Sequence, residues 1–276
     1  MSTSNRRSME MSIRKDAVAG QFYPASKEEI VKMFNYYNKI VDESINDKAV
    51  LHLQPRAIIV PHAGYIYSAF TANIAFRLLK NSHAKRVVVI GPSHRVYVNG
   101  TSVAKYDNYE TPLGNLPIDR KLADELIEKF AMHFQADAHS EHSTEVQMPF
   151  IKNYLPTASV VELVYGNEDP LQLAKVINYL LQDENSVVVI STDLSHYYDI
   201  NKAKQLDTIC LDAVVNLNPQ ELHQGCEACG KIGVEAMLIA AKENSLNPTL
   251  LDYRTSADAS KDKSQVVGYM SAAFTK

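Results

Sequence analysis

The chain has 276 residues, of which 46% are hydrophobic and 22% charged, and its 28 basic and 32 acidic side chains give a net charge of −4. This composition is typical of a globular protein and excludes disordered and fibrous classes. Proteins that bind nucleic acid normally carry a basic surplus, so the charge disfavours that role. No apolar run approaches the roughly 18–20 residues that span a bilayer, so no membrane association is predicted.

The first residues are basic but are followed by no apolar segment, which argues against a secretory signal. We expect residues 1–11 to be a disordered tail and residues 12–276 to form a single domain. The chain contains three cysteines, Cys210, Cys226 and Cys229, too few for a secreted disulfide scaffold. A reduced, cytoplasmic location is therefore predicted.

The first predicted element is a helix over 26–40, where Ser26 and Glu29 form a capping box. Buried strands are expected at four short apolar runs, 57–60, 87–90, 160–164 and 187–190. Further elements are helices at 68–80, 119–134, 171–181, 202–216 and 230–244, short antiparallel strands within 99–118, and a closing strand at 266–274. Alternating strands and helices predict one α/β domain around a mixed, largely parallel sheet.

Ionisable side chains follow three of the apolar strands. His62 follows the first strand, His94 the second, and Asp193 and His196 the fourth. Ligand sites of α/β sheets lie beyond the carboxyl ends of the strands, where loops turn into helices. The repeated placement therefore predicts that these side chains converge on one site.

A polar segment, 139–145, contains His142 and two glutamates. It is compatible with a solvated loop. Glu141 or Glu145 could alternatively orient a metal-binding histidine through its free ring nitrogen.

The segment 225–231 combines glycines, two cysteines and a lysine, but it is not a P-loop. Ile232 stands where a magnesium-binding Ser or Thr is required, and no apolar strand precedes the segment. Cys226 and Cys229 are spaced as half a zinc site or a redox dithiol, although no second ligand pair or thioredoxin-like strand accompanies them. Cys229 alone lies at a helix start, where the helix dipole would lower the pKa of its thiol. A buried structural cysteine remains an alternative, and for Cys226 a plain loop residue is favoured over a resolving thiol.

A serine hydrolase is a further alternative, because Ser93, Ser191 and Ser195 lie near histidines in the sequence. None of them lies in a Gly-x-Ser-x-Gly motif, so this alternative has little support.

At these residues the sequence resembles the Memo family, which is itself similar to the class III extradiol dioxygenases, non-haem iron enzymes that cleave aromatic rings. The matching motifs occur in order along most of the chain: 19–23, 61–65, 91–94, 111–113, 141–145, 191–193 with His196, and Cys229 with Gly230.

The resemblance implies an α/β/α sandwich with a metal held by His62, His94 and Cys229. His142 and Asp193 would line the same pocket. The dioxygenases use a glutamate where this chain has Cys229, and a softer thiolate ligand accommodates Fe(II), Cu or Zn.

In the same resemblance, His196 corresponds to the acid–base histidine, with Asp193 orienting it. We therefore predict a cytosolic metal-dependent oxidoreductase with Fe(II) as the first metal and Cu or Zn as alternatives. The other hypothesis is a non-catalytic protein that binds metal or a peptide in this pocket. Prokaryotic Memo relatives also imply radical-SAM and AMMECR-type companion proteins as partners.

Overall fold

Four apolar runs form the parallel centre of one mixed sheet. The structure is a computed structural model that describes residues 12–45 and 47–276, so the predicted tail 1–11 lies outside the described residues. The central strands lie side by side in the order β2 (Ala57–Val60), β8 (Ser186–Ser191), β3 (Arg86–Pro92) and β7 (Ser159–Tyr165), and all are parallel. The four predicted buried strands are thus confirmed.

Antiparallel strands extend this sheet on both sides. Beyond β2 lie β11 (Val266–Thr275) and then β10 (Asn247–Thr255), and beyond β7 lies β4 (Thr101–Val103). The short strand β9 (His196–Tyr198) pairs with β11. A separate small sheet contains β1 (Ile13–Arg14), β5 (Asn108–Tyr109) and β6 (Leu116–Pro117).

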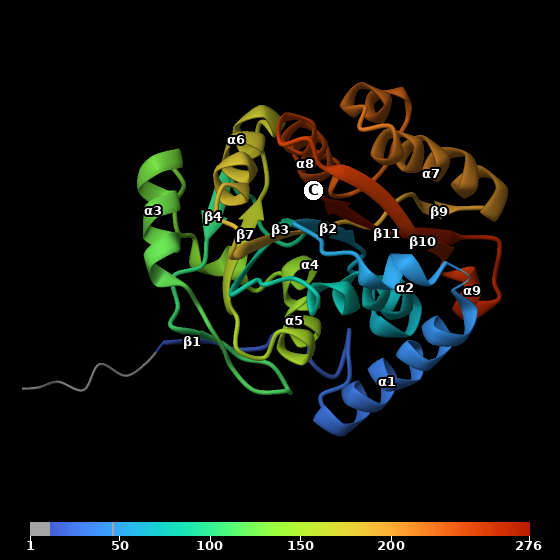
Figure 1. Ribbon diagram of the computed structural model, residues 1–276, viewed down its shortest axis with the longest axis horizontal. Helices are drawn as coiled ribbons and strands as arrows, with labels where there is room; N and C mark the ends of the chain where they lie inside the picture. Colours follow the sequence, from blue (N-terminus) through green and yellow to red (C-terminus); the bar gives the residue numbers. More distant parts are fainter. Residues whose placement is uncertain (1–11, 46) are drawn as a thin grey trace, which may run out of the picture.

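Helices cover both faces of the sheet (Figure 1). One face carries α1 (Lys27–Ser44), α2 (Tyr65–Leu79), α4 (His142–Glu145) and α5 (Met148–Tyr154). The other carries α3 (Arg120–Phe130), α6 (Pro170–Leu181), α7 (Ile200–Val215) and α8 (Lys231–Glu243). The remaining helical turns are α9 (Ala257–Ser260), η1 (Lys48–His52), η2 (Ala136–His139) and η3 (Pro219–Gln224).

The strand residues divide between two hydrophobic cores. In β2, Ala57 and Ile59 belong to the core under α6 and α8, whereas Ile58 and Val60 belong to the core under α1 and α2. This alternation follows from the two-residue repeat of a β-strand and explains why the strand is apolar at every position. The fold is therefore the predicted α/β/α sandwich. Within the described part of the chain, no helix is long and apolar enough to cross a membrane.

A buried carboxylate ties the N-terminal segment to α4. Glu145 accepts hydrogen bonds from the backbone N–H groups of Ala17 and Val18 and from the Tyr23 hydroxyl, each 2.8–2.9 Å long. Arg14 forms a buried ion pair with the same carboxylate. This arrangement fixes the segment that places Phe22 against His142, with 4.6 Å between the ring centroids.

Candidate metal centre

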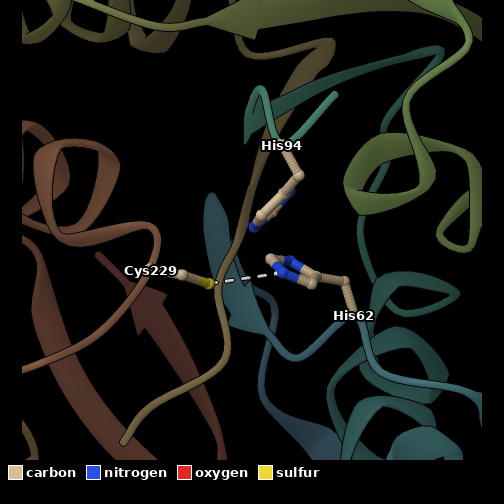
Figure 2. Close-up of side chains that lie close together, drawn as sticks. All are labelled: His62, His94 and Cys229. Carbon is tan, nitrogen blue, oxygen red and sulfur yellow. Dashed lines mark hydrogen bonds between the residues drawn. The ribbon is translucent and has the colours of Figure 1, made fainter. Parts of the chain in front are cut away.

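Three potential metal ligands meet at the carboxyl end of the sheet. His62 lies two residues beyond β2, His94 lies two residues beyond β3, and Cys229 lies just before Gly230, the N-cap of α8. One donor atom from each side chain lies within 4.8 Å of the others. The Sγ atom of Cys229 is 3.3 Å from Nε2 of His62, and Figure 2 shows the three side chains pointing toward one another.

The hydrogen bonds around His62 determine which ring nitrogen carries its proton. The Ser191 hydroxyl donates its single proton to the Ser143 carbonyl at 2.6 Å, so it must accept from Nδ1 of His62 at 2.8 Å. The Gln147 amide also donates to this hydroxyl at 3.0 Å. Nε2 of His62 therefore keeps its lone pair on the side facing Cys229, as a metal ligand requires.

The protonation state of His62 also suits metal binding. Burial lowers the pKa of His62 well below its ordinary value of 6.5, and the nearby His94 and His142 lower it further. The imidazole is therefore neutral at physiological pH.

Removing the Ser191 hydroxyl should weaken metal binding. We expect Ser191→Ala to lower Co(II) affinity roughly 10–100-fold. In this variant Nδ1 of His62 loses its hydrogen-bond acceptor, and the tautomer of the ring is no longer fixed. Titration of the Co(II) absorption bands measures the effect. Ser186→Ala is the control, since Ser186 lies at the opposite end of β8 and bonds to Asp183. Equal affinities in both variants would show that the hydroxyl does not position His62.

Glu141 performs the equivalent role for His94. It accepts the His94 backbone N–H at 2.6 Å, and its other oxygen is 3.2 Å from Nδ1 of His94 and 2.8 Å from Nδ1 of His142. Burial opposes ionisation, but the contacts with His142 and His94 outweigh it and hold the pKa of Glu141 well below its usual range. Of the two glutamates that the sequence suggests as orienting groups, Glu141 is the one beside the histidines. His94, Glu141 and His142 also form a second group of donor atoms within 4.8 Å of one another.

The pKa of the Cys229 thiol differs from the value that the sequence predicts. Burial, together with the nearby Asp193 carboxylate, raises the pKa of Cys229 to about 12. The Asp193 backbone N–H lies 3.3 Å from Sγ and opposes this shift without overcoming it. The prediction of a thiol pKa lowered by the helix dipole was therefore wrong, because Cys229 precedes the helix and is largely enclosed. At neutral pH the side chain is a thiol, and a metal must displace its proton.

Metal affinity should consequently rise with pH. Because the pKa of Cys229 is about 12, each bound metal releases one proton throughout the range pH 7.5–9. His62 adds no proton release there, since its pKa lies well below 6.5. We expect the Co(II) affinity to increase about tenfold per pH unit, measured by competition with a chelator of known affinity. Cys229→Ala should remove this dependence, and a pH-independent affinity in the unmodified protein would contradict the thiol's role.

The three remaining candidate residues, His142, Asp193 and His196, line one cleft of about 490 Å³. Phe22 and Tyr269 form part of its wall. Asp193 is buried and accepts the backbone N–H of His62 at 2.7 Å. It therefore connects this cleft to the loop that carries His62, a contact that the sequence alone did not indicate.

Cys226 is joined to another part of the fold. It forms a disulfide with Cys210 of α7, and Cys229 is the free cysteine. The interpretation of Cys226 as a plain loop residue was therefore wrong, and this pairing also excludes Cys226 and Cys229 as half of a zinc site in the disulfide form. Nothing in a spacing of 16 residues distinguishes such a pair beforehand.

Comparison with known proteins identifies the family. The family model of Memo-like proteins matches residues 14–273. A MEMO1 family protein of Aquifex aeolicus is 32% identical over 278 residues, covering 96% of this chain and 100% of the relative. A MEMO1 family protein of Thermotoga petrophila is 34% identical over 276 residues, covering 94% and 98%. The chain therefore belongs to the Memo-like protein family.

Proposed function

We propose that this protein is a metal-dependent oxidoreductase whose metal is held by His62, His94 and Cys229. The observation that supports this most is the convergence of three donor atoms within 4.8 Å beside a cleft lined by further ionisable groups. The proposed metal is Fe(II), with Cu as the alternative, because two imidazoles and one thiolate suit both.

The surroundings of the donors fit a bound metal. Nε2 of His62 carries a free lone pair, and the ionised carboxylate of Glu141 accepts a hydrogen bond from Nδ1–H of His94. Hydrogen bonds of this kind usually orient the rings of metal-binding histidines. Three protein ligands leave coordination positions open, and a redox-active metal there would supply electron transfer to O₂ or a related oxidant.

The cleft residues would handle the substrate. His196 lines the cleft and is proposed to accept a proton from a substrate hydroxyl, a role suited to an imidazole at neutral pH. His142 would help to orient the substrate, since it lies in the cleft beside Glu141 and against the Phe22 ring. Asp193 would act indirectly, by holding the backbone at His62.

Oxygen uptake by the Fe(II)-loaded protein tests the proposal, with catechol-like phenols as the first substrates. We expect steady consumption that falls roughly 10²–10⁴-fold in His196→Gln, without loss of bound iron. His223→Gln is the matched control, because His223 is half-exposed and pairs with Glu235 away from the cleft. Iron-loaded protein that consumes no oxygen with any of these compounds would argue against an oxidoreductase.

A second candidate function is recognition of a peptide in the same cleft without turnover. The supporting observation is that two exposed aromatic residues, Tyr67 and Tyr197, contribute to its lining, with 42% and 71% of their surface accessible. Exposed aromatic side chains are common anchors in binding surfaces. Retention of a peptide, lost in Tyr197→Ala and unaccompanied by oxygen uptake, would favour this alternative.

A further inference from the structure

A disulfide lies next to the loop that carries the candidate ligand Cys229. It joins Cys210 in α7 to Cys226, three residues before Cys229, and both cysteines are almost fully buried. Neither takes part in the metal centre described above. The disulfide can therefore affect Cys229 only through the loop that carries this residue.

The loop between η3 and α8 is held at two ends. At its start it packs closely on α7: Gly225 has a φ of +126°, and a Cβ atom there would lie 3.2 Å from Ile209. The disulfide follows at the next residue. At its end, Cys229 N–H donates to the Asp193 carbonyl at 3.2 Å and Gly230 N–H to the Thr192 hydroxyl at 2.9 Å. The position of Cys229 is thus set by α7 on one side and by the end of β8 on the other.

Helix α7 also supports the segment that leads to His196. Asp207 lies three residues before Cys210, on the same face of the helix. Its carboxylate accepts the Ser195 N–H at 2.9 Å and the Tyr253 hydroxyl at 2.7 Å. Helix α7 therefore contacts both the segment that leads to His196 and the segment that leads to Cys229. The disulfide links α7 covalently to the segment that leads to Cys229.

We propose that the Cys210–Cys226 disulfide is a redox-sensitive clamp that sets the metal affinity of the Cys229 site. This inference rests on the proposed metal centre. A dithiol reductant would break the Sγ–Sγ bond by giving it two electrons and two protons, which leaves two protein thiols and oxidises the reductant to its own disulfide. A disulfide oxidant would take the same electrons and protons back and restore the bond.

Reduction would loosen the loop without removing any proposed ligand. The segment 226–229 would keep the hydrogen bond from Cys229 N–H to the Asp193 carbonyl but lose its covalent link to α7. Cys229 would then sample more positions, and metal binding would have to restrict them again. We expect the reduced protein to bind Co(II) at least roughly tenfold more weakly. Losses of this size are seen when a contact that supports a metal ligand is removed.

The test compares the full-length protein in two redox states. One sample is purified without reductant, and the other is treated with dithiothreitol and desalted under argon. Alkylation and peptide mass mapping should find Cys210 linked to Cys226 and Cys229 alkylated in the first sample, and three alkylated cysteines in the second. Co(II) titration should then give the weaker affinity in the reduced sample.

A double variant separates the clamp from other effects of the reductant. Cys210→Ala with Cys226→Ala should bind Co(II) like the reduced protein and show no response to dithiothreitol, with an unchanged circular dichroism spectrum. Equal affinities of the two wild-type states, or mapping that finds Cys210 and Cys226 unlinked in the first sample, would overturn the clamp while leaving the metal centre intact. Absence of Co(II) binding in both states would overturn the metal centre and the clamp together.

Discussion

Cys229→Ala and His62→Ala are each expected to lower Co(II) affinity roughly 10²–10³-fold. Four-ligand zinc sites bind with about 10–16 kcal/mol, so one ligand contributes about 2.5–4 kcal/mol. Each 1.4 kcal/mol corresponds to a factor of ten. The Cys229 variant should also lose the sulfur-to-metal charge-transfer band, whereas the His62 variant should keep it at saturating metal.

The control for these variants is His223→Ala. This variant removes a half-exposed histidine side chain six residues before Cys229. His223 does not belong to the cluster of His62, His94 and Cys229. Its affinity should match that of the unmodified protein. If Cys229→Ala or His62→Ala bound Co(II) as tightly as this control, the assignment of His62, His94 and Cys229 as the ligand set would be wrong.

Glu145→Ala is expected to destabilise the folded protein by about 3–5 kcal/mol, the usual cost of leaving one member of a buried ion pair without its partner. Arg14 is only 3% exposed and would lose its carboxylate, and the N–H groups of Ala17 and Val18 would lose their acceptor. The midpoint of thermal unfolding should fall by roughly 10 °C for a chain of this size. Urea or thermal unfolding followed by circular dichroism measures the change.

A neighbouring ion pair provides the matched comparison. Lys15 and Glu110 lie 2.9 Å apart, but Lys15 is 68% exposed. Exposed pairs contribute at most about 1 kcal/mol, so Glu110→Ala should be nearly neutral. Similar losses in both glutamate variants would show that the buried network has no special role in holding the N-terminal segment.

The parallel centre of the fold could be predicted because its strands are short apolar runs, each buried on two faces. Strand β10 was missed for the opposite reason. It is an edge strand with half-buried positions, a register shift between Leu250 and Asp252, and polar residues throughout, so it shows no clear apolar pattern. The helix expected from residue 68 begins at Tyr65, because Gly64 is its N-cap rather than part of a longer turn.

The site was predictable where it depended on strand ends and on family resemblance. His62, His94 and Cys229 were expected together, and the structure places them together. Their supporting contacts were not predictable, since Ser191 meets His62 across 129 residues of sequence. The direction of the Cys229 pKa shift also required the fold, because burial and the nearby Asp193 depend on how distant segments pack.

We propose that His62, His94 and Cys229 hold a redox-active metal with open coordination positions. The most direct measurement is elemental analysis of protein purified without oxygen, together with electron paramagnetic resonance of its nitric oxide adduct. We predict nearly one iron per chain and a nitrosyl signal, both lost in Cys229→Ala. Protein that holds no metal, even after reconstitution with Fe(II) and with Cu(I), would contradict the claim.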